Sequence, residues 1–249
     1  MSSTVDLDPF ERFRHATRAR IGLGRAGDAL PTSAILGFQL AHARARDAVH
    51  GQVDFTALAE ELAPAPTIRV RSRAKDRTVY LARPDLGRQA NPADLPEAAC
   101  QCDIAFVIAD GLSAVAVERH AVPLFQAVMK RLGGFNIAPI ILGEQARVAF
   151  GDEAAAAYGA QIAIVLIGER PGLSVPDSLG AYITFHPRSG RRDSERNCVS
   201  NIHADGLSYE VAADKIAWIV REALRLQLSG VSLKENAEGV LEALSYSKP

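Results

Sequence analysis

Two apolar runs that each end in a polar, glycine-containing turn constrain this chain more than any other feature of its sequence. Residues 104–113 read IAFVIADGLS and residues 163–173 read AIVLIGERPGL. Near-continuous apolar runs of this length are typical of parallel strands buried on both faces. In open α/β sheets, ligands bind outside the carboxyl ends of the strands. The turns at Asp110 and Glu169 therefore predict one composite site.

Strands alternate with helices in the second half of the chain. The expected elements are strand 104–109, helix 114–132, strand 138–142, helix 144–158, strand 161–167, strand 181–185 and helix 209–227. Alternation of this kind predicts βαβ units, in which helices cover both faces of a sheet. The expected fold is α/β, with a Rossmann-like, doubly wound and mostly parallel sheet.

The N-terminal part predicts a helical arm. Pro9 suits a first helical turn, and a second helix over residues 34–49 can be capped by Thr32 or Ser33. Residues 67–82 alternate apolar and basic side chains, which predicts one or two exposed strands. We therefore divide the chain into a helical arm (1–66), a strand-containing linker region (67–99) and a Rossmann-like cofactor-binding domain (100–249).

Composition excludes several classes of protein. The 28 basic and 29 acidic side chains nearly cancel, so bulk attraction to nucleic acid is not expected. Three cysteines form no even disulfide framework and indicate a reducing compartment, which predicts a cytoplasmic protein. The N-terminus lacks the apolar core of a signal peptide, and no apolar stretch of about 20 residues predicts a membrane span.

The segment from Gly22 to Gly27, GLGRAG, matches the spacing of a dinucleotide-binding fingerprint. That fingerprint needs a strand before it and a helix opening within it, and the sequence predicts neither here. A turn between two helices is the favoured interpretation. A free-standing nicotinamide-dependent dehydrogenase stays as the competing enzyme class, and a cobalamin carrier or shell-docking adaptor as the competing binding class.

Several residues at the strand ends are candidates for ligand contact. Asp110 can cap the helix that starts near Ser113, contact a ligand, or do both, and the backbone of that helix start can bind an anion or an amide oxygen. A carboxylate placed directly after a buried strand, as at Glu169, is costly unless it is solvated, paired with Arg170, or hydrogen-bonded to a ligand. The candidates from this crevice alone are Asp110, Gly111, Leu112, Ser113, Arg147, Gly168 and Arg170.

No catalytic or metal-ligating set is apparent. Cys100 and Cys102 lack a second ligand pair at zinc-site spacing, and Cys198 has no visible base, so it suits a pocket wall better than a nucleophile. Residues 201–206 nearly match the D-x-H-x-x-G pattern of some cobalamin proteins, but Asn201 replaces the acid that would orient His203. Common hydrolase and phosphoryl-transfer motifs are absent from the sequence.

Five ordered motifs carry a family resemblance. They are GRAGDALPT at 24–32, VIADGLSAVAVERHA at 107–121, APIILGEQARVAFGDE at 138–153, LIGERPGLSVPDSLGAYITF at 166–185 and ERNCVSNIHADGLSYEVAA at 195–213. Together they resemble the small (light) subunit of ethanolamine ammonia-lyase, over about residues 8–235.

The resemblance implies a lyase that converts ethanolamine to acetaldehyde and ammonia by an adenosylcobalamin-dependent radical mechanism. It implies a hetero-oligomer in which a large (heavy) TIM-barrel subunit binds ethanolamine and carries the catalytic residues, so this chain alone is expected to be inactive. Whether the complex enters a bacterial microcompartment, and how many subunit pairs it contains, is left open.

By the same resemblance, Val148, Glu169 and Cys198 are the expected direct contacts to adenosylcobalamin. Val148 and Cys198 can pack on apolar corrin or nucleotide surface, and Glu169 can accept hydrogen bonds from carboxamide or hydroxyl groups. His203 is not carried over as a cobalt ligand, because the family's cofactor keeps its own base as lower ligand. We interpret His203 as a surface-loop residue.

Overall fold

A computed structural model describes residues 9–17, 19–96 and 101–233 of the chain. The strands are β1 (Thr67–Arg71), β2 (Ile104–Ala109), β3 (Ile140–Glu144), β4 (Ile162–Gly168), β5 (Leu179–Phe185) and β6 (Asn197–Ile202). The α-helices are α1 (Glu11–Ala16), α2 (Thr32–His50), α3 (Phe55–Leu62), α4 (Arg77–Ala82), α5 (Pro84–Gly87), α6 (Ala114–Met129), α7 (Val148–Ala157) and α8 (Tyr209–Leu226). The short 3₁₀ helices are η1 (Pro92–Asp94), η2 (Asp193–Glu195) and η3 (Gly230–Ser232).

The six strands form one sheet in the order β1-β3-β2-β4-β5-β6. The first four strands in this order run parallel, and β5 and β6 are added antiparallel. The carboxyl ends of β2 and β4 therefore lie side by side at one edge of the sheet, as the sequence predicts. The expectation of an α/β fold with a mostly parallel sheet is confirmed.

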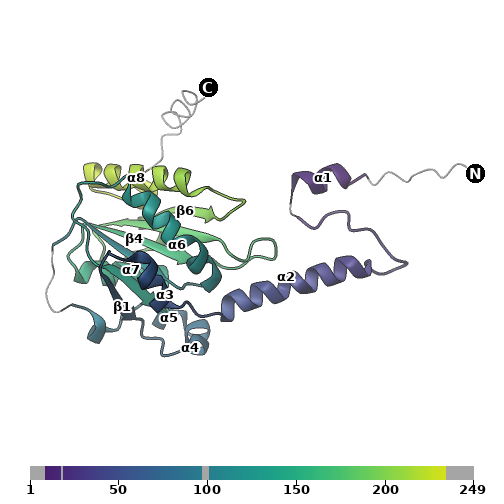
Figure 1. The fold of residues 1–249 in the computed structure, drawn as a ribbon, viewed down its shortest axis with the longest axis horizontal. Coiled ribbons are helices and arrows are strands. Elements are labelled where there is room, and N and C mark those ends of the chain that lie inside the picture. Colours follow the sequence, from purple (N-terminus) through teal and green to yellow (C-terminus); the bar gives the residue numbers. More distant parts are fainter. Residues whose placement is uncertain (1–8, 18, 97–100, 234–249) are drawn as a thin grey trace, which may run out of the picture.

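Helices cover both faces of the sheet (Figure 1). Alternate residues of β2 point to opposite faces: Phe106 and Ile108 pack in the core beneath α6 and α8, and Val107 packs beneath α7. All six residues of β2 are buried, which explains why its sequence is apolar throughout. Helix α7 packs on β2, β3 and β4, and Cys198 on β6 is exposed.

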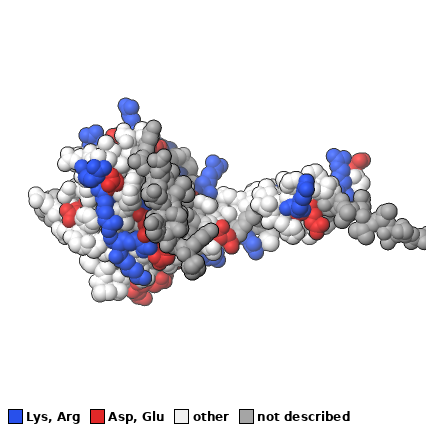
Figure 2. All heavy atoms as spheres, turned by 90° about the horizontal axis from the view of Figure 1, so that it is seen from above, with Lys and Arg blue, Asp and Glu red and all other residues white. Residues whose placement is uncertain are grey.

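Helices α1 and α2, which we call the arm, project from the body of the molecule (Figure 1). Helix α3, also inside the predicted arm of residues 1–66, packs in the core through Phe55, Leu58 and Leu62. Of the α2 side chains only Ala48 is buried. Leu36, Phe38 and Leu40 are 59%, 46% and 53% exposed, and most of the arm's visible surface is uncharged (Figure 2). None of the described helices has the length and apolar character that crossing a membrane requires.

The structure corrects the interpretation of residues 67–82. Only the first part is a strand, and the second part is helix α4, which Asp76 caps by accepting the backbone N–H of Val79 at 2.8 Å. The alternation of apolar and basic residues predicted a strand here. It did not take into account that Asp76 can cap a helix and so start one at Arg77. Strand β1 pairs with β3, so the sheet extends beyond residues 100–249 into the predicted linker region.

Other elements also differ from the prediction. Strand β6 was not expected, because its exposed polar residues lack the apolar run that marked the other strands. Helix α1 is short and ends at Ala16. The cap predicted for α2 is absent: Pro31 precedes the helix, and no side chain caps it. Asp8, Cys100 and residues 234–249 lie outside the described residues.

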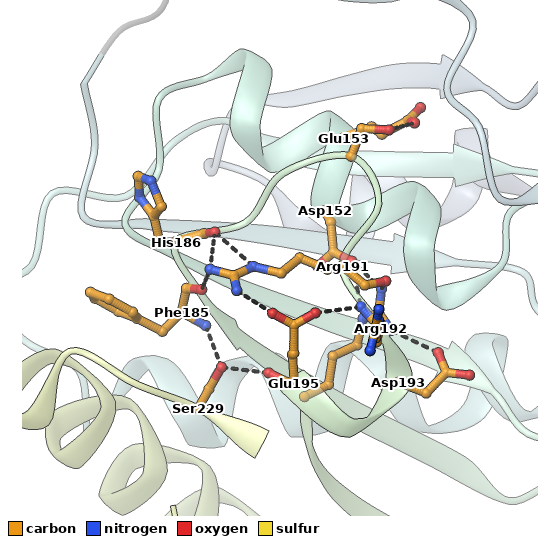
Figure 3. Close-up of polar contacts among 11 residues, drawn as sticks. Asp152, Glu153, Phe185, His186, Arg191, Arg192, Asp193, Glu195 and Ser229 are labelled. Atoms are coloured by element: carbon orange, nitrogen blue, oxygen red, sulfur yellow. Dashed lines mark hydrogen bonds and ion pairs between the residues drawn. The ribbon is translucent and has the colours of Figure 1, made fainter. Parts of the chain in front are cut away.

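The loop between β5 and β6 is held by an arginine-centred network (Figure 3). The Arg191 guanidinium donates to the carbonyl oxygens of Phe185 at 3.0 Å and His186 at 2.9 Å, and pairs with Glu195 at 2.5 Å. Ser229, before η3, donates to the Glu195 carbonyl at 2.6 Å and accepts the Phe185 N–H at 3.0 Å. These contacts fix the position of β6 against the end of β5.

A buried ion pair ties this loop to α7. The Arg196 guanidinium donates to the carboxylate of Asp152, and both side chains are 1% exposed. Asp152 lies on α7, which begins at Val148, and Arg196 lies just before β6, which carries Cys198. The pair therefore fixes two predicted contact residues relative to each other.

We predict that Arg196→Met lowers the free energy of unfolding by about 3–5 kcal/mol, because it leaves the Asp152 carboxylate buried without its counter-ion. Urea denaturation followed by circular dichroism measures the change. The control is Arg88→Met, at an exposed position, where a change within about 0.5 kcal/mol is expected. A loss as small as the control's would show that Arg196 is not needed to hold the two elements.

Candidate functional site

The turns after β2 and β4 are in direct contact. Leu112 donates its backbone N–H to the Gly168 carbonyl at 2.9 Å. Gly111 has a φ of +59°, and a Cβ there would lie 2.3 Å from the Gly168 oxygen, so this contact requires glycine. The sequence predicts one composite site for the turns at Asp110 and Glu169, and in the structure the two turns pack together as a single rim.

A hollow of about 440 Å³ opens beside this rim. Its walls are Tyr80, Gly111, Leu112, Arg147, Val148, Ile167, Gly168, Glu169, Arg170 and Tyr182. Seven of the ten sequence-predicted contact residues are in this set. The remaining three, Asp110, Ser113 and Cys198, lie elsewhere.

Asp110 faces into the protein. Its side chain is 3% exposed and accepts backbone N–H groups from Gly111, Gln145 and Ala146, each at 2.9 Å. The Arg77 guanidinium lies 3.6 Å from the carboxylate. Asp110 thus caps the turn between β3 and α7, and it does not cap α6 as one interpretation had it.

Ser113 caps α6 instead. Its Oγ accepts the Ala116 N–H at 3.2 Å and donates to the Pro176 carbonyl at 2.8 Å. The residue is fully buried, and its hydroxyl makes both of its hydrogen bonds within the protein. Ser113 shapes the rim but does not line the hollow.

Glu169 is half-buried at the edge of the hollow. It does not form the ion pair with Arg170 that was one of the predicted alternatives. Oε2 accepts the Ser178 hydroxyl at 2.5 Å, and no donor among the described residues reaches Oε1. A Cβ at Gly180 would lie 3.0 Å from Oε1, so this glycine leaves space for the carboxylate. Glu169 therefore keeps an acceptor oxygen available to a ligand.

Cys198 lies beyond Tyr182, which links it to the hollow. The two residues are opposite each other in the β5–β6 ladder. Partial desolvation of the sulfur raises the pKa of the Cys198 thiol, and the tyrosine opposes this only in part. Cys198 is therefore a neutral thiol at pH 7, which suits a contact surface and not a nucleophile.

Sequence reasoning missed Tyr80, Ile167 and Tyr182. Tyr80 lies on α4, in the segment interpreted as strand. Tyr182 alternates with Ala181 and Ile183, which pack in the α6 and α8 core, so the strand period alone places Tyr182 on the opposite face. That signal was present in the sequence, but it could not show that Tyr182 lines the hollow.

His203 is not a surface residue as predicted. It is 7% exposed, its Nε2 pairs with Asn201 Oδ1 at 3.0 Å, and its Nδ1 accepts the Asp205 N–H at 3.3 Å. Both ring nitrogens thus find partners within residues 201–205. The Gly22 to Gly27 segment lies between α1 and α2, away from any strand of the described chain, as a helix–helix turn would.

A second, larger hollow of about 830 Å³ lies at the same sheet edge near β1 and β3. Its charged side chains are largely paired within the protein: Arg71 binds Asp94 at 2.6 Å, and Arg69 donates to Thr56 at 2.5 Å. Asp110 and Arg77 also border this hollow. We regard the smaller hollow as the candidate site because seven of the ten sequence-predicted contact residues line it.

Comparison with known proteins gives one consistent family match. A family model described as "Ethanolamine ammonia-lyase light chain" matches residues 7–234. The chain is similar to proteins named ethanolamine ammonia-lyase small subunit from Azotobacter vinelandii (50% identity, 95% of this chain, 92% of the relative), Ralstonia nicotianae (52%, 95% and 92%) and Rhodopseudomonas palustris (50%, 98% and 96%).

We predict that Asp110→Asn lowers the free energy of unfolding by about 2 kcal/mol at pH 7, because the amide NH₂ would face backbone donors that need acceptors. Urea denaturation provides the measurement, with the exposed Asp28→Asn as the matched control. A variant as stable as the control would contradict the capping role.

The stability of the wild type should also depend on pH through Asp110. Burial raises the pKa of Asp110 from 3.8 to about 6, despite three backbone N–H groups and Arg77. Between these values the folded state binds a proton that the unfolded chain releases, so the contribution of Asp110 to stability falls as the pH rises from about 4 to 6. The stability difference between the wild type and Asp110→Asn should narrow over this range and become constant above it. A difference independent of pH would contradict the assignment.

Proposed function

The chain belongs to the ethanolamine ammonia-lyase small-subunit family, and from this premise we propose that it is the cofactor-holding subunit of an adenosylcobalamin-dependent ethanolamine ammonia-lyase. The enzyme would convert ethanolamine to acetaldehyde and ammonia. A large subunit would bind ethanolamine and carry the catalytic residues, and this chain alone would be inactive. The observation that carries the proposal is that Val148 and Glu169, far apart in sequence, meet at one hollow on the carboxyl edge of the sheet.

The residues of the hollow fit the chemistry of a corrinoid. Val148, Leu112 and Ile167 offer apolar surface, which suits the flat hydrocarbon ring. Glu169 Oε1 can accept a hydrogen bond from a carboxamide N–H or a ribose hydroxyl. Arg147 has a buried Nε–H without a hydrogen-bond acceptor. A bound ligand can supply this acceptor.

The size of the hollow supports sharing of the cofactor between two subunits. A site of about 440 Å³ is within the range for a drug-sized ligand, and adenosylcobalamin is much larger. This chain would therefore hold one side of the cofactor and keep water from that side. When bound, the cofactor supplies the radical chemistry, which the side chains of this hollow do not.

Two side chains beside the hollow that could take part in catalysis are not available for it. Cys198 is a neutral thiol, and Asp110 is committed to backbone N–H groups. Within the described ranges, no three histidine, cysteine or acidic side chains gather as a metal site would require. These residues are suited to binding and orienting.

The arm supports the proposed partner. Ile35, Leu36, Phe38 and Leu40 are exposed in the first half of α2, and a group of exposed large apolar side chains is typical of a protein–protein contact surface. A hollow between α2 and residues 173–176 makes this surface continuous with the segment that follows Arg170. We propose that the large subunit that covers the cofactor also covers the arm.

The activity itself is tested by co-expressing this chain with an ethanolamine ammonia-lyase large subunit. The purified mixture with adenosylcobalamin should form acetaldehyde from ethanolamine, and each subunit alone should not. Absence of acetaldehyde from a complex that has assembled would refute the proposed reaction.

We predict that Glu169→Ala raises the dissociation constant for adenosylcobalamin by up to roughly tenfold while the subunits still assemble, because one hydrogen bond to an uncharged group contributes about 0.5–1.5 kcal/mol. Calorimetric titration of the assembled complex measures this constant. The control is the exposed Glu60→Ala on α3, which should bind as the wild type does. If both variants bind equally, Glu169 has only a structural role.

We further predict that the double substitution Leu36→Gln and Leu40→Gln weakens association with the large subunit by at least about tenfold, because each exposed leucine buried at an interface contributes roughly 1.5–3 kcal/mol. Circular dichroism should show an unchanged fold, since neither side chain is buried in this chain. Gel filtration of mixed subunits measures the association. Unweakened assembly would remove the arm from the interface.

A further inference from the structure

Arg147 is a half-buried arginine that lacks an acidic partner. Its Nε is buried without a hydrogen-bond acceptor, and no carboxylate of the described residues forms an ion pair with its guanidinium. A buried donor left unpaired costs about 1–3 kcal/mol, and more when the group is charged. Since Arg147 lines the hollow, a ligand can supply the missing acceptor.

The structure also holds Arg147 in one place. Its guanidinium carbon lies 4.4 Å from the ring centroid of Tyr80, a residue with no exposed surface whose hydroxyl donates to the Ala146 carbonyl at 3.2 Å. The Arg147 N–H donates to the Gly87 carbonyl at 2.8 Å. A Cβ at Gly87 would lie only 3.1 Å from Arg147 Cγ, so the glycine leaves room for the arginine stem. An arginine fixed in this way loses little entropy when it binds a ligand.

The charges around the hollow favour one negative group. Arg147 and Arg170 both line it, and neither forms an ion pair with a described residue. Glu169 is the one acid in the lining, and its Oε2 is already bound to Ser178. Arg147 also directly precedes α7, whose N-terminal end adds a favourable potential for an anion.

We propose, resting on the function proposed above, that Arg147 binds the phosphodiester of the nucleotide loop of adenosylcobalamin. That phosphodiester is the group of the cofactor with a permanent negative charge, whereas the carboxamides around the corrin ring are neutral. A planar guanidinium matches two phosphate oxygens at once. Arg147 thereby sets the side of the cofactor that faces this chain.

Two probes that differ in the phosphate test the proposal. Cobinamide lacks the phosphate, ribose and base, and cobinamide phosphate keeps the phosphate alone. The complex of this chain with its large subunit is titrated with each, and binding is followed by the corrin absorbance. We expect the wild-type complex to bind cobinamide phosphate roughly 10- to 100-fold more tightly than cobinamide, as expected for hydrogen bonds to a charged group.

Variants then assign that preference to one residue. Arg147→Gln should abolish the preference while leaving the affinity for cobinamide unchanged, which also shows that the hollow has kept its fold. Arg147→Lys, which retains the charge, should keep part of the preference. The control Arg88→Gln, an exposed arginine next to α5, should keep all of it.

Three results would overturn the inference. A wild-type complex without a preference, or a preference that survives in Arg147→Gln, would mean that Arg147 does not bind the phosphate. If Arg147→Gln weakened the binding of both probes by the same factor, Arg147 would only shape the hollow or contact the corrin amides. An assembled wild-type complex that binds neither probe nor adenosylcobalamin would instead refute the proposed function, and the inference with it.

Discussion

The site depends on the burial of one carboxylate, that of Asp110. This side chain joins three parts of the chain at the carboxyl edge of the sheet: the end of β2, the turn from β3 into α7, and Arg77 on α4. An isolated buried charge would be unstable, and the three backbone N–H groups and the guanidinium offset that cost. Because α7 starts immediately after this turn, Asp110 fixes the direction in which Val148 and Arg147 enter the hollow.

Arg77 and Tyr80 on α4 connect the Asp110 turn to neighbouring elements. Arg77 donates to the Val49 carbonyl at 2.7 Å and the Gly111 carbonyl at 2.9 Å, so it connects the end of α2 to the rim. The guanidinium groups of Arg77 and Arg147 lie 4.7 Å and 4.4 Å from the ring centroid of Tyr80. The arm, the rim and the first turn of α7 are therefore linked through one short helix, α4. On the other side, the pair of Arg196 and Asp152 fixes β6 against α7.

The apolar strands and their terminal turns were predictable from the sequence. β2, β3 and β4 are buried on both faces, so each is marked by a continuous apolar run, and the glycines and acids mark where it ends. Strand β6 and helix α4 were not predictable in this way. β6 is an edge strand with one polar face, and α4 is a six-residue helix, so neither is long enough or apolar enough to leave a clear period.

The sequence by itself determined which residues end the strands, and hence that Gly111, Val148 and Glu169 would gather at one sheet edge, because parallel strands present their carboxyl ends together. Only the tertiary structure decided the direction of each side chain. Asp110 turns inward because three backbone N–H groups from two turns converge on it, and no local pattern encodes that convergence. Tyr80 and Tyr182 enter the wall of the hollow because Tyr80 on α4 packs against Arg147, just before α7, and because Tyr182 lies on the face of β5 opposite the α6 and α8 core. Such contacts form between residues distant in sequence, so they exist only once the sheet and its helices have packed.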